Sequence, residues 1–297
     1  MVMSEGVRCV VPGSDVLGET PLWCEQTQSL LWLDIEQARL QRFHPASGRH
    51  DVFQFDERYV GSLALLRRPG RVLLGLDLAL VSFDLGTGQR ELVCQVEPDG
   101  GADNRLNDGR CDSRGRFWVG TMDNQLHRGN GGVYRVDPDG SAHRQFGDVI
   151  VANTIAMSPG EDTLYFSDTR RYTTWRFGLD MEAGKLGERQ VFVDHTAVRD
   201  RPDGACVDAQ GYVWNAIFAG KRVVRYAPDG RIDRVIALPV SNPTCVCFGG
   251  PDLRTLYITT ARRFLTRQQL RDEPWSGSLL AIDVDVQGLP ERRFGRD

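Results

Sequence analysis

The chain has 297 residues, 41% of them hydrophobic and 26% charged, and its formal net charge is −4 at pH 7. This slightly acidic composition, without a basic cluster, argues against nucleic acid and anionic membranes as partners. The first residues, MVMSEGVRCVVPG, lack the pattern of a signal peptide, and no apolar stretch reaches the length of a transmembrane helix. Seven cysteines without a CxxC spacing predict reduced core thiols and a cytoplasmic protein.

One short apolar phrase recurs six times in chain order. The copies are SLLWLDI, RVLLGLD, RGRFWVGTM, TLYFSDT, YVWNAIF and TLYITTA, with central residues Trp32, Leu74, Trp118, Tyr165, Trp214 and Tyr257. Subtracting neighbouring residue numbers gives steps of 42, 44, 47, 49 and 43 residues. A period in the forties is typical of repeat folds, and we interpret the central side chains as core.

Each phrase is followed by a predicted hairpin and preceded by a short strand and a turn. GVYRVDPDGSAHRQF, for example, places Pro-Asp-Gly between two alternating segments. Four strands per repeat, six times over, predict an all-β fold, a six-bladed β-propeller with four-stranded blades and one domain over residues 1–297. VRCVV at 7–11 is expected to pair with the last blade, and the helical pattern at 266–274 is expected to be a loop insertion.

Polar residues recur at one point of the repeat, 11 to 13 residues before each central residue. They are Glu19, Ser62, Asn107, Asn153, Asp203 and Thr244. The first strand of each propeller blade lines the central channel, so equivalent positions form a ring at one mouth. We therefore expect Glu19, Asn107, Asn153 and Asp203 to face a common centre.

Two carboxylates aimed at one point require either a shared proton or a cation between them. With a neutral amide oxygen they form a hard site suited to Ca²⁺, Mg²⁺ or Mn²⁺, although Zn²⁺ or Fe²⁺ also fits an open site. Asp and Asn before Gly are also ordinary turn formers, so a structural role stays open for each residue alone. Asp108 is out of phase with the ring and is interpreted as a turn residue.

Other side chains are weaker candidates. Arg105 lies two residues before Asn107 and either reaches the channel mouth or forms a surface ion pair. Asp123 follows a strand and is a candidate for ligand contact, whereas His127 and His195 lie in polar loop sequence and are expected to be solvated. Three loops, at 123–132, 170–175 and 261–277, are expected to shape the pocket, and their arginines suit an oxygen-rich ligand.

Five motifs resemble the sugar lactonase family of gluconolactonase, regucalcin and luciferin-regenerating enzyme over nearly the whole chain. They are LGETPLW at 17–23, RLNDGRCDSRGRFWVGTM at 105–122, VANTIAMSPGEDTLYFSDT at 151–169, RPDGACVDAQGYVW at 201–214 and CVCFGGPDLRTLYIT at 245–259. The resemblance implies a six-bladed propeller.

The same resemblance assigns roles to individual residues. It implies that Glu19, Asn153 and Asp203 bind a metal, that Arg105 and Asn107 face a sugar, and that Asp203 is the general base. Thr154 departs from the family, which usually has Gly after the ligand Asn. A β-branched residue there is expected to restrict the backbone or narrow the pocket.

These features predict a metal-dependent hydrolase that opens an aldono-1,4- or 1,5-lactone to the aldonic acid. The cofactor is one divalent ion, and the partner is a small sugar lactone, bound by a monomer or weak homodimer. Arg105, Asn107 and Asp123 would hold ring hydroxyls. Either Asp203 takes the proton of the attacking water or the metal generates hydroxide from water. A calcium- or metabolite-binding propeller without turnover, and a hydrolase of non-sugar esters or phosphoesters, remain alternatives.

Overall fold

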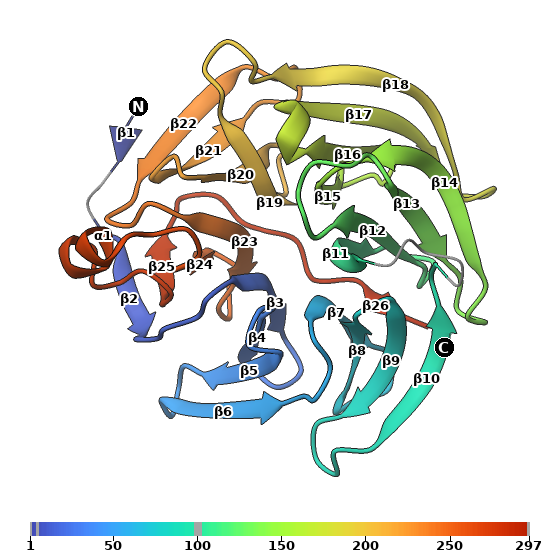
Figure 1. Ribbon diagram of the computed structural model, residues 1–297, viewed down its shortest axis with the longest axis horizontal. Helices are drawn as coiled ribbons and strands as arrows, with labels where there is room; N and C mark the ends of the chain where they lie inside the picture. The colour runs from blue at the N-terminus through green and yellow to red at the C-terminus, as the bar shows by residue number, and fades with distance from the viewer. Residues whose placement is uncertain (1, 4–5, 98–102, 296–297) are drawn as a thin grey trace.

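The computed structural model describes residues 2–3, 6–97 and 103–295, and nearly all regular structure in them is β-strand. Six small sheets stand around a central channel, as Figure 1 shows. In four sheets the first of the four repeat strands lies innermost. The other two, which end the ring, also have their innermost strand at the start of the repeat but take an outer strand, β1 (Val2–Met3) or β2 (Arg8–Val11), from the N-terminal region. The predicted six-bladed β-propeller is therefore confirmed.

The blades follow one another along the chain and each consists of antiparallel neighbours. Blade 1 contains β3 (Gly18–Cys24), β4 (Ser29–Asp34), β5 (Arg39–His44) and β6 (Arg49–Gln54). Blade 2 contains β7 (Val60–Leu66), β8 (Arg71–Leu76), β9 (Ala79–Asp84) and β10 (Arg90–Gln95). Blade 3 contains β11 (Asn104–Cys111), β12 (Phe117–Asp123), β13 (Gly131–Val136) and β14 (Ala142–Val149).

The second half of the ring repeats this order. Blade 4 contains β15 (Ala152–Met157), β16 (Thr163–Asp168), β17 (Thr173–Asp180) and β18 (Lys185–Asp194), with the 3₁₀ helix η1 (Thr169–Arg171) after β16. Blade 5 contains β19 (Arg201–Val207), β20 (Val213–Phe218), β21 (Arg222–Tyr226) and β22 (Ile232–Ala237). Blade 6 contains β23 (Pro243–Gly249), β24 (Thr255–Thr260), β25 (Leu279–Asp283) and β2 (Arg8–Val11).

Both ends of the chain help to close the ring. β2 pairs antiparallel with β25, with Arg8 opposite Ala281, so the expected contribution of residues 7–11 to the last blade is confirmed. Two further strands pair in parallel with existing blades: β1 (Val2–Met3) with β22, and β26 (Arg293–Phe294) with β7. The repeat pattern did not predict these two short pairings.

The core lies between neighbouring blades. The central residues of all six phrases are buried, and Trp32, Trp118 and Trp214 are among the largest fully buried side chains. One cluster, for example, joins Leu33 of blade 1 to Leu63 and Leu74 of blade 2. Alternation along each strand turns one face toward each neighbouring blade, and both faces are apolar because each blade is covered on two sides. The prediction that these residues are core is confirmed.

The helical pattern near residue 270 forms α1 (Arg267–Asp272), between β24 and β25, as predicted. Thr266 caps it, accepting from the Gln269 amide while the Gln269 side chain accepts from the Thr266 amide. Within the described ranges, no helix is both long and apolar enough to cross a membrane. All seven cysteines are free, five of them buried, which agrees with the predicted reduced thiols.

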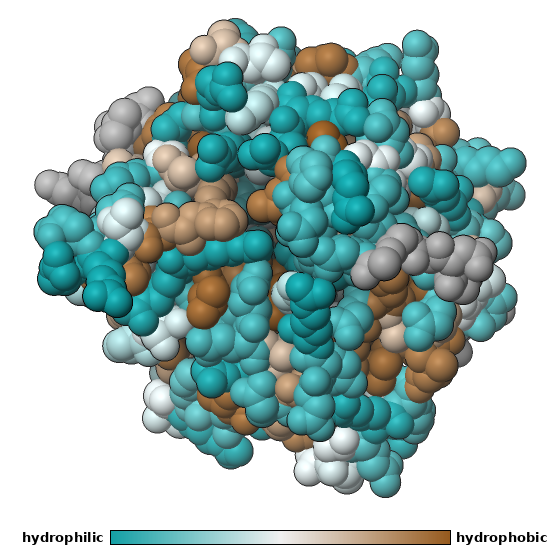
Figure 2. Space-filling model, viewed as in Figure 1, coloured by the Kyte–Doolittle hydropathy of each residue, from teal (hydrophilic) through white to brown (hydrophobic). Residues whose placement is uncertain are grey.

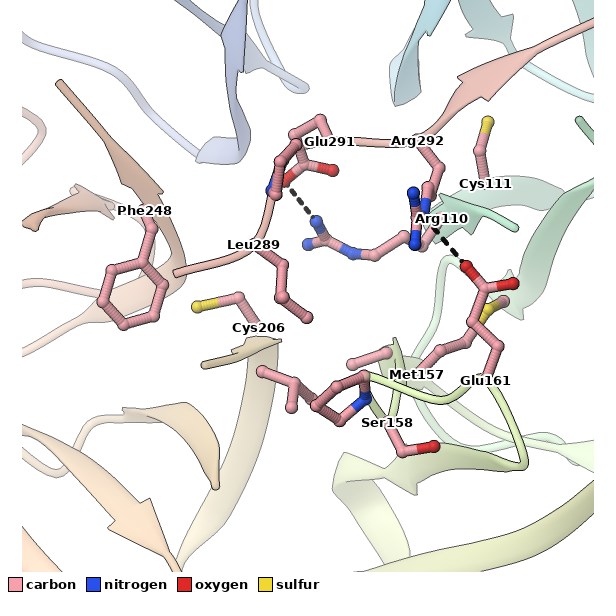
Figure 3. Close-up of a pocket in the computed structure, with 14 residues that line it drawn as sticks. Arg110, Cys111, Met157, Ser158, Glu161, Cys206, Phe248, Leu289, Glu291 and Arg292 are labelled. Carbon is pink, nitrogen blue, oxygen red and sulfur yellow. Dashed lines mark hydrogen bonds and ion pairs between the residues drawn. The ribbon is translucent and has the colours of Figure 1, made fainter. Parts of the chain in front are cut away.

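The C-terminal segment runs from blade 6 across the channel to reach β7 (Figure 1). Gly288 permits a close passage, because a Cβ there would lie 2.1 Å from the Phe248 Cβ. Glu291 then pairs with Arg110 at 2.6 Å, and Arg292 pairs with Glu161 at 2.9 Å (Figure 3). Arg110 lies near the end of β11, so this closure is at the mouth opposite to the start of the inner strands.

Candidate active site

Each inner strand has an irregularity in its pairing at the ring position found in the sequence. The register shifts lie between Glu19 and Leu22, Val60 and Ser62, Leu106 and Gly109, Asn153 and Ala156, Pro202 and Ala205, and Pro243 and Cys245. A bulge leaves residues out of the ladder and turns their side chains in a new direction. The repeated bulge is therefore the element that presents polar side chains to the channel.

Four of the predicted ring residues come together on the wall of one cavity. The cavity measures about 610 Å³ including the part open to solvent, and Glu19, Asn107, Asn153 and Asp203 line it. Figure 2 shows a mostly hydrophilic face with a small hollow near its centre, around the propeller axis. Their roles in binding a metal or a substrate stay predictions.

Ser62 and Thr244, the other two ring positions, instead link neighbouring inner strands. The Ser62 hydroxyl donates to the Asn107 carbonyl oxygen, and the Thr244 hydroxyl donates to the Gly18 carbonyl oxygen at 2.5 Å. These bonds join β7 to β11 and β23 to β3. They hold the strands that carry Asn107 and Glu19 at fixed separations.

The side chains of Glu19 and Asp203 are both buried and line the same cavity. Burial, followed by the charge of Asp108, raises the pKa of Glu19 to about 8. Burial and the charge of Glu19 raise the pKa of Asp203 well above its usual range. Two such groups cannot both ionise without a compensating charge, so the pair holds either a proton or a cation.

Asp108 is not the turn residue expected from its phase. It lies inside β11, within the bulge, with only 4% of its surface exposed, and it accepts a hydrogen bond of 2.8 Å from the Ile155 amide. Burial raises its pKa to about 6, and its charge acts on both Glu19 and Asp203. Counting residues along the repeat did not identify Asp108, because the bulge leaves two consecutive residues, Asn107 and Asp108, outside the regular alternation of side chains.

Hydrogen bonds fix the orientation of the Asn153 amide. The Thr169 hydroxyl donates its single proton to the Pro202 carbonyl oxygen at 2.6 Å, so it can only accept from the Asn153 Nδ2 at 2.7 Å. This leaves the Asn153 Oδ1 facing Asn107, whose Nδ2 donates to it at 2.8 Å. One lone pair of Oδ1 stays available for a cation or another donor.

Asn107 is oriented in the same way. Its Nδ2 also donates to the Ala152 carbonyl oxygen at 2.7 Å, which identifies the nitrogen, and its Oδ1 accepts from the Arg105 Nη1 at 2.5 Å. Both amide protons are therefore used within the protein. The second lone pair of Oδ1 remains to accept from a ligand hydroxyl.

Thr154 takes the left-handed backbone conformation, with φ of 56°. This region favours glycine and is strained for a β-branched residue. The backbone restriction expected at Thr154 is therefore a strained left-handed conformation. The Thr154 hydroxyl donates to the Asp203 carbonyl oxygen at 2.5 Å and accepts from the Asn215 Nδ2 at 3.1 Å. Thr154 thus links β15 to β19, and it is not among the residues that line the cavity.

Arg105 is buried at the cavity wall with 2% of its surface exposed. Its Nη1 donates to the Leu106 carbonyl oxygen at 2.9 Å, and its Nε has no hydrogen-bond partner in the structure. Within the described residues Arg105 forms no ion pair and bonds neutral oxygens instead, so the surface ion pair that the sequence left open is not formed. Burial and the nearby charge of Arg263 lower the pKa of Arg105 to about 10.

Asp123 is buried and does not line the cavity. Its carboxylate accepts from the amides of His127 and Arg128 and pairs with the Arg128 guanidinium at 2.5 Å, which holds its pKa well below the usual range. It thereby fixes the loop that brings Leu126 to the cavity. The equivalent residues Asp34 and Asp168 also end a second strand and accept from loop amides.

The three loops expected to shape the pocket all contribute to its wall or lie beside it. Leu126 comes from the first loop, Arg170 from the second, and Arg263 and Phe264 from the third. The sequence analysis missed Arg201, which also lines the cavity. Its spacing could have identified it, because Arg201 precedes Asp203 by two residues as Arg105 precedes Asn107.

The two weak histidine candidates differ from one another. His127 is exposed as expected. His195 is not solvated: only 2% of it is exposed, and its Nε2 lies 3.1 Å from the Thr174 hydroxyl. Neither lines the cavity.

The donor set at the cavity floor suits a hard divalent ion. Glu19 and Asp203 supply two charges and Asn153 an oriented amide oxygen, and mutual repulsion between the carboxyls would be relieved by a cation. Over the described ranges, no cluster of three or more His, Cys, Asp or Glu side chains forms a metal site. The candidate set contains only two such residues, and its third ligand would be an amide.

Comparison with known proteins gives consistent matches over almost the full length. Residues 17–262 match the model of the SMP-30/gluconolactonase/LRE-like region. The chain is 40% identical to a 6-deoxy-6-sulfogluconolactonase of Pseudomonas putida, covering 98% of this chain and 99% of that one. It is 34% identical to an L-arabinolactonase of Azospirillum brasilense, covering 94% and 92% of the two chains.

A solved structure shows the same fold in detail. The crystal structure of regucalcin from Agrobacterium tumefaciens, described as a calcium-binding protein, has a TM-score of 0.94, 31% identity and 99% coverage of both chains. With the family model matched over most of the chain, this protein belongs to the SMP-30/gluconolactonase/LRE-like family.

Proposed function

We propose that the protein is a divalent-metal-dependent hydrolase that opens an aldono-1,4- or 1,5-lactone to the aldonic acid. The observation that carries the proposal is that the buried side chains of Glu19 and Asp203 line one cavity together with Asn153, whose amide is oriented by hydrogen bonds. Relatives named for sulfogluconolactone and arabinolactone hydrolysis support a sugar lactone as the substrate.

Glu19, Asn153 and Asp203 would hold the ion, which is Ca²⁺, Mg²⁺, Mn²⁺, Zn²⁺ or Fe²⁺ by the chemistry of these ligands. When bound, a divalent ion polarises the lactone carbonyl and stabilises the negative charge that develops as water adds. Asn107 supports this arrangement by donating to the Asn153 Oδ1, which keeps the amide oxygen directed at the floor of the cavity.

Asp203 would move the proton. Its carboxylate takes a proton from the attacking water as the new C–O bond forms at the carbonyl carbon. The proton then passes to the ring oxygen as the ring C–O bond breaks, which leaves the open aldonate. Burial and the Glu19 charge raise the pKa of Asp203 in the metal-free site, and a bound cation would lower it again.

Two side chains would hold the sugar. Arg105 and Asn107 both line the cavity, and Asn107 retains an acceptor lone pair, so together they offer guanidinium donors and an amide acceptor to ring hydroxyls. Asp123 would contribute indirectly, by fixing the loop that places Leu126 against the substrate.

A second candidate function is binding of calcium without turnover. It is favoured by the regucalcin structure, described as that of a calcium-binding protein, which this chain matches at a TM-score of 0.94. The same acidic floor would serve that role, so activity must be measured directly.

The test is a panel of aldonolactones incubated with chelator-treated protein, with acid release followed at constant pH and each metal then added back. We expect activity to fall by about 100-fold or more without metal and to return with at least one ion. Asp203→Asn should lose both metal affinity and about 10³-fold in rate. The exposed Asp229→Asn is the matched control.

Three outcomes separate the candidates. Full activity of the metal-free protein, or of Asp203→Asn, would contradict the mechanism. Tight calcium binding with no hydrolysis across the panel would favour the binding function. Hydrolysis of simple esters but no lactones would point to a different substrate class.

A further inference from the structure

Four arginines surround the cavity above its acidic floor: Arg105, Arg170, Arg201 and Arg263, together called the arginine rim. Arg105 and Arg201 lie two residues before Asn107 and Asp203 on their inner strands. Both arginines lie at or next to the first residue of their strand and line the cavity, so they lie nearer the mouth at which the inner strands begin than the floor residues. The rim is thus a second tier of the same channel.

The rim carries positive charge that the protein only partly balances. Arg263 pairs with Glu36 at 2.8 Å. In the described ranges, Arg105, Arg170 and Arg201 form no ion pair with a carboxylate. The Tyr172 hydroxyl accepts from Arg199 at 3.3 Å, and the pKa of Tyr172 is lowered by Arg199 and Arg201. Guanidinium groups repel one another at such a site, and an anion among them would remove the repulsion.

One member of the rim is buried with an unmet donor. Only 2% of the surface of Arg105 is exposed, and its Nε has no hydrogen-bond partner, although the side chain lines the cavity. Its Nη1 donates to the Leu106 carbonyl oxygen and to the Asn107 Oδ1, so the guanidinium is held at the cavity wall by neutral oxygens and its charge is not neutralised there.

The loop that carries Arg263 is already held in place. The amides of Arg262 and Arg263 donate to the Asp15 and Val16 carbonyl oxygens at 3.1 and 2.9 Å, and the Asn242 Nδ2 donates to the Arg263 carbonyl oxygen at 2.8 Å. The following residue, Phe264, packs edge-on against Phe218 at the cavity wall. A preformed rim of this kind requires little reorganisation on binding.

We propose that the arginine rim recognises an anionic substituent, a sulfonate, phosphate or carboxylate, at the end of the lactone remote from its carbonyl. This inference rests on the proposed lactonase function, which places the carbonyl at the floor between Glu19 and Asp203. The far end of the same molecule then lies one tier up, among the guanidinium groups. Guanidinium forks match oxyanions bidentately, whereas a neutral hydroxyl offers a single oxygen.

The first experiment compares kcat/KM for D-glucono-1,5-lactone with that for its 6-phospho and 6-deoxy-6-sulfo forms and for D-glucaro-1,4-lactone. We expect at least one anionic lactone to be preferred by about 10- to 100-fold, the range of one or two charge-assisted hydrogen bonds. The preference should fall as the salt concentration rises. The three anionic arms also distinguish sulfonate, phosphate and carboxylate.

Variants then test the rim itself. Arg201→Gln and Arg170→Gln should each raise KM for the preferred anionic lactone by about 10-fold and change kcat/KM for the neutral lactone by less than about 3-fold. Arg201→Lys keeps the charge but loses the fork and should be intermediate. Arg231→Gln, on an outer hairpin of the blade that carries Arg201, removes the same charge away from the cavity and is the control.

Calorimetric titration with gluconate and 6-phosphogluconate makes the inference testable even without turnover. Equal affinity for the two, or equal losses for neutral and anionic lactones in the rim variants, would overturn it while leaving lactone hydrolysis intact. Stronger binding of 6-phosphogluconate, lost in Arg201→Gln, would support it. Absence of hydrolysis with every lactone would instead contradict the proposed function.

Discussion

Thr154 carries backbone strain next to the candidate metal ligand Asn153. A left-handed conformation costs a residue with a Cβ roughly 1–2 kcal/mol. The two hydrogen bonds of the Thr154 hydroxyl, to the Asp203 carbonyl oxygen and from Asn215, offset part of this cost. Thr154 is therefore strained in its backbone, but its hydroxyl fixes the strand of Asn153 to the strand of Asp203.

Substitutions at Thr154 should separate strain from hydrogen bonding. Thr154→Ala keeps the strain and loses both bonds, so its free energy of unfolding should fall by about 1–2 kcal/mol. Thr154→Gly also loses the bonds but relieves the strain, and should be more stable than Thr154→Ala by about 1 kcal/mol. Thr154→Ser should be closest to the natural protein. Urea denaturation measures the free energy of unfolding of each variant. A Thr154→Gly variant that is less stable than Thr154→Ala would contradict this order.

The sequence predicted the floor of the cavity better than its walls. Equal spacing identified Glu19, Asn153 and Asp203 because every inner strand repeats the same bulge. Asp108 escaped detection because that bulge interrupts the alternation on which the phase was counted. The sequence made Asp123 a candidate for ligand contact. It lies at the end of the second strand of its blade, as Asp34 does, and like Asp34 it accepts hydrogen bonds from loop amides.

In three blades an aspartate accepts from the indole of the core tryptophan; in blades 3 and 5 it follows the first strand, and in blade 1 it precedes that strand. Asp15, Asp112 and Asp208 accept from the Nε1 of Trp32, Trp118 and Trp214, each at 2.9 Å. Asp208 also accepts from the amides of the turn between β19 and β20 and from the Arg225 guanidinium. One carboxylate thus ties together the turn, the core and the third strand of blade 5.

Loss of Asp208 should destabilise the fold more than loss of a surface carboxylate. Asp208→Ala leaves the Trp214 Nε1 and part of the Arg225 charge buried without partners, and should lower the free energy of unfolding by about 3 kcal/mol. Asp229→Ala, on the exposed hairpin of the same blade, should leave it nearly unchanged. Chemical denaturation measures both, and equal effects would show that the turn does not depend on Asp208.

At the level of elements, the period and hairpin turns sufficed to predict the blades. The two-residue strands β1 and β26 could not be predicted, because so short a pairing leaves no alternation to detect. The arginine rim also combines inner strands with separate loops, so its assembly depends on how the ring closes.

For the whole molecule, the C-terminal segment acts as a brace across the channel. The pair between Glu291 and Arg110 is largely buried, with 11% and 12% of the two side chains exposed. Glu291→Ala should therefore lower the free energy of unfolding by about 3–5 kcal/mol, because it leaves the Arg110 charge without its carboxylate.

Arg292 provides the matched control on the same segment. It pairs with Glu161 but is 48% exposed, and the Glu161 carboxylate keeps the Ser113 amide and hydroxyl as donors, so Arg292→Gln should cost less than about 1 kcal/mol. Thermal and urea unfolding compare the two variants. A small effect of Glu291→Ala would mean that the segment is not part of the cooperative unit.

The brace also decides how molecules reach and leave the floor of the cavity. Residues 284–294 cross the channel at the mouth opposite the cavity, where Glu291 pairs with Arg110. If the protein turns over lactones as proposed, this arrangement favours departure of the product through the mouth by which the lactone enters. Substrate binding and product release would then use the same route, and a product that dissociates slowly would prevent the next substrate from binding. In a cavity with one entrance, the rate of product release would limit turnover together with the rate of the chemical step.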